Sequence, residues 1–272
     1  MLIAQISDPH IKPEGQLAYN RINTAGFLAR AVDHLLHLDP RPDVVLGTGD
    51  LIDDATDASY EHLRRLLAPL PMPVYLIPGN HDDRDGMRRA FPHHTYLPRE
   101  GFIQYVVDDG PVRMIALDTL IPGQSGGRID AERIAWLEAR LTEAPGRPTV
   151  LFMHHPPFRT GIEYMDNIGL EGADALAAAV ARYPNVERVL CGHLHRTIQT
   201  RWAGTVAMTI PSTAHAVGFD VRHDVPLSLT LEPPGYGLHL WRPGAGLVSH
   251  IALPGEYQRY TVGMATPKPS KT

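Results

Sequence analysis

Apolar and polar positions alternate in blocks along the first half of the chain. Short apolar runs at residues 2–6, 43–46 and 74–77 predict buried strands. Between them, apolar residues recur every three to four positions over residues 22–36 and 58–67, as in helices that bury one face. This alternation of strands and helices favours an α/β fold with parallel strands.

The second half keeps this alternation and then becomes rich in strands. Apolar runs at residues 102–107 and 112–117 flank Asp108-Asp109-Gly110-Pro111, a strong hairpin signal. A helix is expected over residues 131–141, with Asp130 as its N-cap. Further helices are expected at residues 84–91 and 174–182, and further strands at residues 149–153, 186–190, 197–202, 205–210, 237–241 and 246–251.

The chain divides by pattern into three parts without a low-complexity linker. Residues 1–200 form the expected α/β core. Residues 201–261 form a β-rich segment that completes or caps the core and could build an oligomer interface. Residues 262–272 consist mainly of small and polar residues with proline, which predicts a flexible tail.

Five of the expected strands end in short turns that carry Asp, His or Asn. The carboxyl ends of parallel strands are where open α/β sheets bind ligands, so these side chains are expected to converge. The turns are Asp8-Pro9-His10, Gly49-Asp50, Gly79-Asn80-His81-Asp82, His154-His155 and Gly192-His193-Leu194-His195. Because side chains alternate along an extended segment, the two outer residues of Asp-x-His and of His-x-His should point the same way. The three glycines should let the backbone turn sharply and leave room beside a cofactor.

The donors in these turns predict a metal site. A mixture of carboxylate and imidazole donors suits borderline divalent metals such as Mn, Fe, Zn or Co, and contains too much nitrogen for calcium. The donors exceed what one ion needs, so two ions are expected. Asp50, the lone carboxylate of its turn, is the natural bridge between them. Two such ions can clamp a phosphate and hold a hydroxide for in-line attack.

In this order and at these separations, the five turns resemble the signature of the calcineurin-like metallophosphoesterases. The resemblance extends from residue 8 to residue 195. More specifically, the chain resembles the bacterial class III cyclic-nucleotide phosphodiesterases and the related glycerophosphodiesterases. The resemblance implies a four-layer α/β/β/α metallophosphoesterase sandwich with a β-rich C-terminal extension.

The same resemblance implies roles for individual residues. One metal would be bound by Asp8, His10, Asp50 and His195, and the other by Asp50, Asn80, His154 and His193. Asn80 and His81 would also contact the substrate, and His81 would assist catalysis together with the bridging Asp50. Tyr19 and His215 are the candidates for two further substrate contacts.

These roles imply a binuclear metal-dependent phosphodiesterase. It would hydrolyse small phosphodiesters, either cyclic nucleotides or glycerophosphodiesters, by attack of a metal-bound hydroxide. A phosphomonoesterase or nucleotidase on the same centre is the alternative enzyme. A non-catalytic scaffold of the same fold should have broken ligand turns, whereas every turn is intact in this chain.

Charge, apolar runs and cysteine content limit the kinds of molecule that the chain is expected to bind and where it is expected to act. With a net charge of −5, the chain has no basic field for polynucleotides, and it lacks the run of about 20 apolar residues that spans a membrane. Cys191 is its only cysteine, so no intrachain disulfide forms and a cytoplasmic location is expected. The expected partners are a small phosphodiester and other copies of the chain, since relatives often form dimers or larger assemblies.

Overall fold

Two β-sheets face each other between layers of helices. The computed structural model describes residues 1–258, 260 and 262. The first sheet consists of β1 (Leu2–Ile6), β2 (Val44–Thr48), β3 (Val74–Ile77), β14 (Tyr236–Arg242) and β15 (Gly246–Ala252). Its strand order is β15-β14-β1-β2-β3, with β1, β2 and β3 parallel and β14 antiparallel to β1.

The second sheet has a parallel centre and antiparallel edges. Its strands are β4 (Tyr105–Val107), β5 (Arg113–Ala116), β7 (Thr149–Phe152), β9 (Val186–Cys191), β10 (Ile198–Trp202) and β11 (Thr205–Thr209). They lie in the order β10-β11-β9-β7-β5-β4, and β5, β7, β9 and β11 are parallel. The parallel strands end on the same side, which brings their following loops together.

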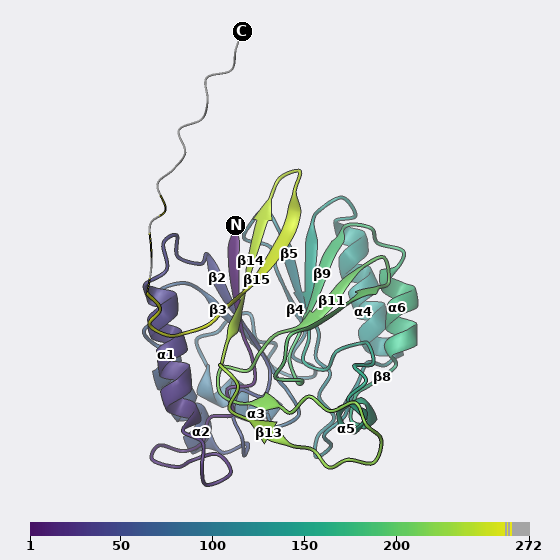
Figure 1. The fold of residues 1–272 in the computed structure, drawn as a ribbon. Coiled ribbons are helices and arrows are strands. Elements are labelled where there is room, and N and C mark those ends of the chain that lie inside the picture. Colours follow the sequence, from purple (N-terminus) through teal and green to yellow (C-terminus); the bar gives the residue numbers. More distant parts are fainter. Residues whose placement is uncertain (259, 261, 263–272) are drawn as a thin grey trace.

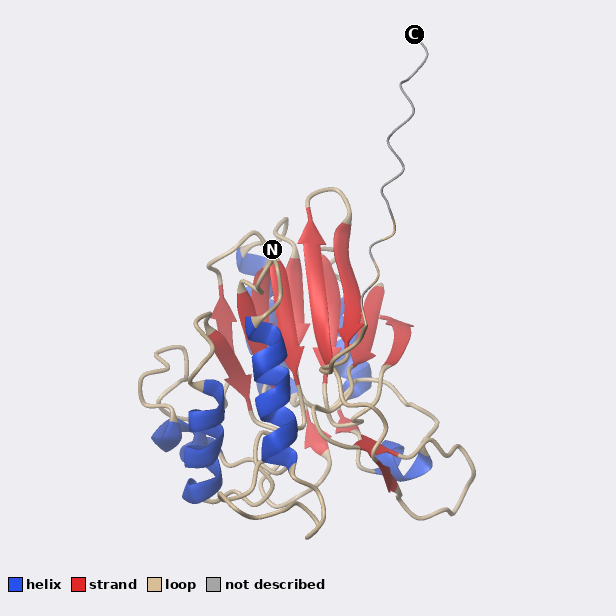
Figure 2. Ribbon diagram, turned by 60° about the vertical axis from the view of Figure 1, so that its left-hand side comes forward, coloured by secondary structure: helices blue, strands red, loops and turns tan. Residues whose placement is uncertain are grey.

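Helices cover the outer faces of both sheets. On the first sheet lie α1 (Thr24–Leu36), α2 (Asp57–Leu67) and α3 (Arg84–Ala90), and on the second lie α4 (Ala131–Glu143) and α6 (Ala173–Val180). Figure 1 shows α1 and α2 on one side of the sheets and α4 and α6 on the other. The turned view of Figure 2 shows a layer of strands behind the first group of helices. The chain therefore adopts the expected α/β/β/α sandwich.

The apolar faces that the sequence pattern predicts form the core. Leu28 and Leu35 of α1 and Leu63 of α2 are fully buried in one cluster with residues of the first sheet. Leu137 of α4 and Leu176 of α6 belong to a second cluster beneath the other helical layer. Burial of a leucine side chain contributes about 2 kcal/mol, so these amphipathic helices are held mainly by packing against the sheets.

The expected elements are present with small shifts at their ends. The expected hairpins β4–β5 and β10–β11 are antiparallel pairs, and the two expected later strands form a third antiparallel pair, β14–β15. Asp130 caps α4 by accepting a hydrogen bond from Arg133 N at 3.0 Å. The sequence pattern did not reveal the short elements, which lack enough residues for a period: α5 (Glu163–Asn167), β6 (Gly127–Arg128), β8 (Leu170–Glu171), β12 (Ala216–Val217) and β13 (Leu229–Thr230).

Segments beyond residue 200 contribute to both sheets. Strand β11 pairs with β9, and β14 pairs with β1 over Leu2–Gln5. The tail expected at residues 262–272 lies outside the described residues, apart from Val262. No helix in the described part of the chain is both long and apolar enough to cross a membrane.

Candidate metal centre

The side chains of the five turns meet at one end of the two sheets. The donor atoms of Asp8, His10, Asp50 and His195 all lie within 4.8 Å of one another, and all four residues are buried. His10 Nε2 is 3.2 Å from His195 Nε2 and 3.6 Å from an Asp50 carboxylate oxygen. His195 Nε2 is 3.5 Å from Asp8 Oδ1. The structure thus brings together the residues expected to bind one metal.

Asp50 also faces the donors expected at the second metal. Its Oδ2 is 3.4 Å from His154 Nε2, and that nitrogen is 3.2 Å from Asn80 Oδ1. The His193 ring stands beside the His154 ring, with the centroids 5.1 Å apart. Asp50 therefore lies between the two groups of donors, where a bridging carboxylate would be.

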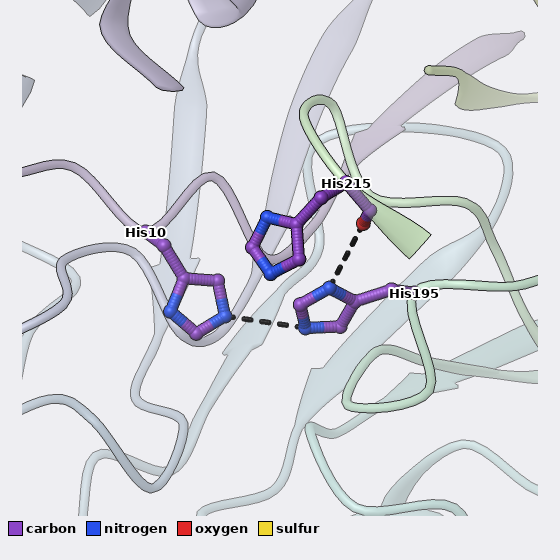
Figure 3. A group of neighbouring side chains, drawn as sticks. All are labelled: His10, His195 and His215. Atoms are coloured by element: carbon purple, nitrogen blue, oxygen red, sulfur yellow. Dashed lines mark hydrogen bonds between the residues drawn. The ribbon is translucent and has the colours of Figure 1, made fainter. Parts of the chain in front are cut away.

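Each of the four central histidines uses one ring nitrogen to hold its orientation. His154 Nδ1 donates to Thr48 O at 2.8 Å. His195 Nδ1 donates to His215 O at 3.0 Å, as Figure 3 shows. His193 Nε2 donates to Ile168 O at 3.1 Å, and His10 Nδ1 lies 3.3 Å from Asp53 Oδ1. The other nitrogen of each ring is left for a ligand, which is the arrangement that metal-binding histidines require.

The donor set fits divalent cations. In neutral histidines held this way, His10 Nε2 and His195 Nε2 direct lone pairs at each other across 3.2 Å, which is repulsive unless a proton or a cation lies between them. Two buried carboxylates, Asp8 and Asp50, adjoin the same space. Buried charges of one sign need a partner of the opposite sign. Two divalent cations would satisfy these donors.

The pKa values in the metal-free chain reflect the same charge imbalance. Burial would lower the pKa of His154, but the Asp50 and Asp8 carboxylates raise it to about 9. Burial raises the pKa of Asp8 to about 6. The pKa of Asp50 is well below its usual value, because His154 and His10 outweigh the effect of burial. Without a cation, a proton on His154 compensates Asp50, and a bound metal would replace that proton.

The sequence predicts that strand alternation makes these side chains point the same way, but the structure brings them together by a different means. Both outer residues of Asp-x-His and of His-x-His, as well as Asp50, lie in the left-handed region of backbone conformation. Their φ values are 51° for Asp8, 45° for His10, 46° for Asp50, 70° for His193 and 50° for His195. The strands end just before these residues, and single left-handed residues then turn the side chains inward.

The glycines of the turns make room for the ligand side chains themselves. A Cβ on Gly79 would come within 2.2 Å of Asp50 Oδ1, and one on Gly49 would come within 2.4 Å of His154 Nδ1. A Cβ on Gly192 would meet Ser7 Oγ at 2.2 Å. Gly49 also has a φ of +90°, which favours glycine. The room expected beside a cofactor is therefore occupied by protein atoms.

The residues expected to contact substrate border the same centre. The His81 ring is 4.6 Å from the His10 ring, and its Nδ1 donates to Asp53 O at 2.9 Å, so its Nε2 is free. The His215 ring is 4.6 Å from the His195 ring and 5.5 Å from the ring of Tyr19. Figure 3 shows His215 standing next to His10 and His195. Neither ring nitrogen of His215 has a hydrogen-bond partner among the described residues.

The sequence does not identify several residues that hold the proposed metal ligands in place, or leaves their role undecided. Asp53 contacts His10 at 3.3 Å and Lys12 at 3.4 Å, although its position in a polar turn is equally typical of a solvated residue. Ser212 Oγ donates to Asp8 O at 2.7 Å from far along the chain. A backbone carbonyl such as Ile168 O carries no sequence signal at all.

The chain is similar to known phosphoesterases over most of its length. Residues 1–197 match the family model described as calcineurin-like phosphoesterase. The chain is 37% identical to the probable glycerophosphodiester phosphodiesterase GpdQ of Arcobacter nitrofigilis, over 95% of each protein. It is 33% identical to the 3',5'-cyclic adenosine monophosphate phosphodiesterase CpdA of Pseudomonas aeruginosa, over 78% of this chain and 76% of that protein.

Among solved structures, the fold is similar to that of a dimetal phosphatase from Danio rerio. The TM-score is 0.61 at 16% sequence identity, and the match covers 94% of this chain and 99% of that one. At this identity the likeness supports the fold alone.

Proposed function

Since the chain belongs to the calcineurin-like phosphoesterase family, we propose that it is a metal-dependent phosphodiesterase whose substrates are small phosphodiesters, with glycerophosphodiesters preferred. The observation that carries this proposal is the buried group of donors around Asp50, in which each histidine keeps one ring nitrogen for a ligand. When bound, a pair of divalent cations supplies Lewis-acid polarisation of the phosphate and activates the attacking water.

We propose the ligand sets that the resemblance implies. The first set is Asp8, His10, Asp50 and His195, and the second is Asp50, Asn80, His154 and His193. Imidazole nitrogens and carboxylate oxygens favour Mn, Fe, Zn or Co over Mg or Ca. The metal in the cell then depends on which of these ions is available to the folding chain.

His81 is the proposed catalytic side chain on the substrate. The hydrogen bond from its Nδ1 to Asp53 O fixes the ring and leaves Nε2 for a ligand. Asp53 Oδ1, 3.8 Å from Nδ1, is placed to stabilise an imidazolium. In that state Nε2–H can donate to a phosphate oxygen or protonate the leaving alkoxide.

His215, Tyr19 and Asn80 are the proposed positioning contacts for substrate. Burial, with a smaller contribution from the neighbouring His195, lowers the pKa of His215 to about 2. A neutral His215 offers one donor and one acceptor, which suits hydroxyl groups of an alcohol better than a phosphate charge. Tyr19 stands edge-on to this ring and is half-exposed at the mouth of the site.

A polar hollow beside the centre favours a substrate whose alcohol group is a polyol or carries a charge over a substrate with a nucleobase. It has a volume of about 650 Å³ and begins at Asn80 and His81. Its remaining lining includes Arg88, Arg99 and Glu100, and no phenyl, phenol or indole ring of the described residues takes part. The proposed contact Tyr19 stands outside this hollow, beside His215. Nucleobases are usually bound by stacking on such rings. The match to the glycerophosphodiester phosphodiesterase also extends over nearly the whole of both chains, including the segment after residue 200.

A substrate panel tests the proposal. Metal-depleted protein is supplied with Mn²⁺, Co²⁺, Zn²⁺ or Fe²⁺ and assayed with bis(4-nitrophenyl) phosphate, 4-nitrophenyl phosphate, glycerophosphoethanolamine and cyclic AMP. We expect both diester hydrolysis above monoester hydrolysis and glycerophosphoethanolamine above cyclic AMP. A preference for the monoester would make the chain a phosphomonoesterase, and silence with every metal would make it a scaffold.

We also propose that the chain acts as a homo-oligomer in the cytoplasm. Large apolar side chains are exposed on the segment around β12 and β13, among them Phe219 (69%), Val221 (53%) and Leu231 (66%). An apolar surface of this kind supports burial against another copy. Cys191 is the single cysteine, so no intrachain disulfide can form and the fold needs no oxidising compartment. Light scattering during size-exclusion chromatography tests the oligomer, and a monomer mass would refute it.

A further inference from the structure

A chain of buried polar side chains links three strands of the first sheet and contacts the second sheet at Cys191. Its members are Gln5 on β1, Thr48 on β2 and His239 on β14, and all three are fully buried. Gln5 interrupts the otherwise apolar strand Leu2–Ile6. Burying such groups is costly unless every polar atom is paired, so their partners decide what the chain of hydrogen bonds does.

The direction of each hydrogen bond follows from the partners of Gln5. Its Nε2 donates to Thr48 Oγ1 at 2.9 Å and to Cys191 O at 3.0 Å. A carbonyl can only accept, so the amide nitrogen of Gln5 must face Cys191 and its oxygen must face β14. That oxygen, Oε1, therefore accepts from His239 Nε2 at 3.0 Å. His239 Nδ1 is left to accept from Ser249 Oγ at 2.8 Å.

His239 is electrically neutral in this position. Burial, with a smaller contribution from the Arg188 guanidinium, lowers its pKa to about 3. A neutral ring has one donor and one acceptor, and the pair of contacts to Gln5 and Ser249 uses each once. The glycine opposite Gln5 in the strand register, Gly237, leaves the room: a Cβ there would lie 2.7 Å from His239 Nε2.

At its other end the chain of hydrogen bonds reaches a proposed metal ligand. Thr48 Oγ1 donates to Ser7 Oγ at 2.7 Å, next to Asp8 in the sequence. The carbonyl of the same Thr48 accepts from His154 Nδ1 at 2.8 Å, which sets the His154 tautomer and directs Nε2 toward Asp50. The position of Thr48 thus fixes His154, Gln5 holds the Thr48 side chain, and His239 holds Gln5.

We propose that His239 is a positioning residue for the metal centre, acting through Gln5 and Thr48 on the orientation of His154. This inference rests on the proposed function above. The β14–β15 hairpin lies beyond the part of the chain matched by the family model. According to this inference, the hairpin nevertheless helps to orient a ligand of the metal centre. Outer partners of metal-binding histidines typically affect metal affinity or activity by about 10- to 100-fold. Thr48 is the direct partner of His154, and His239 is two residues beyond Thr48 in the chain of hydrogen bonds. We therefore expect an effect at the lower end of this range.

The test compares His239→Leu with His239→Gln in the full chain. Leucine cannot donate to Gln5 Oε1, whereas the amide nitrogen of glutamine can take the place of His239 Nε2. For each variant, the dissociation constant of Mn²⁺ from the metal-depleted protein is measured, together with kcat and KM for bis(4-nitrophenyl) phosphate. We expect His239→Leu to weaken Mn²⁺ binding about tenfold and to lower kcat with little change in KM. His239→Gln should restore both to near the wild-type values.

Tyr236→Phe provides the matched control. Tyr236 is buried on the same strand, and its hydroxyl lies 2.6 Å from His34 Nδ1 on α1, away from the centre. Removing that hydroxyl should lower the melting temperature without weakening Mn²⁺ binding. The inference is overturned if His239→Leu binds Mn²⁺ like the wild type, if His239→Gln is as weak as His239→Leu, or if Tyr236→Phe weakens binding equally.

A milder variant covers the case in which His239→Leu does not fold. Ser249→Ala removes only the donor to His239 Nδ1 at the partly exposed end of the chain of hydrogen bonds. It should weaken Mn²⁺ binding about two- to threefold, and unchanged binding would count against the inference. Because Mn²⁺ affinity is measured without substrate, a wild-type chain that binds Mn²⁺ but hydrolyses no phosphoester would refute the proposed function while still testing His239.

Discussion

At the scale of single residues, the metal centre is held in backbone conformations that most residues avoid. Asp8, His10 and Asp50 all have φ values near +50°. Each such residue costs of order 1–3 kcal/mol and persists only where the surroundings enforce it. Here the enforcement includes hydrogen bonds from Asp8 N to Gly49 O and from His10 N to Asp50 O, at 3.1 and 3.0 Å.

The identity of these residues could be predicted from the sequence, but their conformation could not. The turn pattern alone indicated Asp8, His10 and Asp50 as donors, because carboxylates and imidazoles at strand ends are typical of metal sites. A positive φ at a non-glycine residue leaves no mark on the sequence. The role of the supporting residue Asp53 was left open, since an aspartate in a turn is equally typical of a carboxylate that orients a histidine and of a solvated residue.

His81→Ala should lower turnover without removing the metals. His81 contributes no atom to either proposed ligand set, and its side chain is about one third exposed. Loss of a general acid typically costs about 10²- to 10⁴-fold in kcat. Metal content measured by mass spectrometry should stay within error of the wild type. The exposed His93 offers a control substitution, His93→Ala, which should change neither quantity. Loss of metal in parallel with activity would instead make His81 a ligand.

Asp53→Asn should weaken metal binding through His10. The charged carboxylate lies against His10 Nδ1 and keeps Nε2 available on the other side of the ring. A neutral amide holds the ring less firmly, so affinity at the site of His10 should fall about 10-fold or more. Asp54→Asn is the matched control, because Asp54 pairs with the same Lys12 but does not touch the centre. Equal metal affinities in the two variants would contradict the role of Asp53.

At the scale of secondary-structure elements, sequence periodicity was most informative where it was longest. The helix expected at residues 58–67 is observed as Asp57–Leu67, and the strand expected at residues 74–77 is observed as Val74–Ile77. Element α5, with only five residues, offers too short a window for a helical period. It nevertheless matters to the site, because the residue after it, Ile168, supplies the carbonyl that holds His193.

The N-terminal cap of α4 gives a prediction about stability alone. Asp130 accepts from Arg133 N and also pairs with the Arg133 guanidinium at 3.1 Å. Asp130→Ala should lower the free energy of unfolding by about 1 kcal/mol, measured in urea. Asp130→Asn, which keeps an acceptor for the backbone, should lose less. Activity per folded molecule should be unchanged in both variants, and equal stability of alanine and asparagine variants would contradict the capping role.

The C-terminal strands could be predicted as strands, but not placed. The sequence pattern left open whether residues 201–261 complete the core or cap it. Nothing in the local sequence of β14 indicates that it pairs with β1 at the opposite end of the chain. Such long-range pairing is decided by packing of the whole molecule, which a local pattern does not contain.

At the scale of the whole molecule, buried neutral histidines make the fold sensitive to acid. The pKa of His239 is lowered to about 3 in the folded chain by burial, whereas an exposed histidine titrates near 6.5. Between these pH values the unfolded chain binds a proton that the folded chain does not, so stability falls as the pH falls below about 6.5. His155, whose pKa burial also lowers to about 3, acts in the same direction.

His239→Gln should reduce this sensitivity. The substitution removes one titrating group while keeping the donor to Gln5. From pH 6 to pH 4, the free energy of unfolding of the metal-free wild type should decline more steeply than that of the variant, by up to about 1.4 kcal/mol per pH unit. Urea unfolding at several pH values measures both slopes, and parallel slopes would show that His239 is not buried as a neutral ring.

The central claim is that the converging turns bind two cations that are needed for phosphodiester hydrolysis. It is tested most directly by adding Mn²⁺ stepwise to the metal-depleted chain and following bis(4-nitrophenyl) phosphate hydrolysis together with bound metal. The account predicts that activity rises until two equivalents are bound per chain and is abolished by a chelator. Full activity without metal, or no binding at the concentrations that sustain hydrolysis, would contradict it.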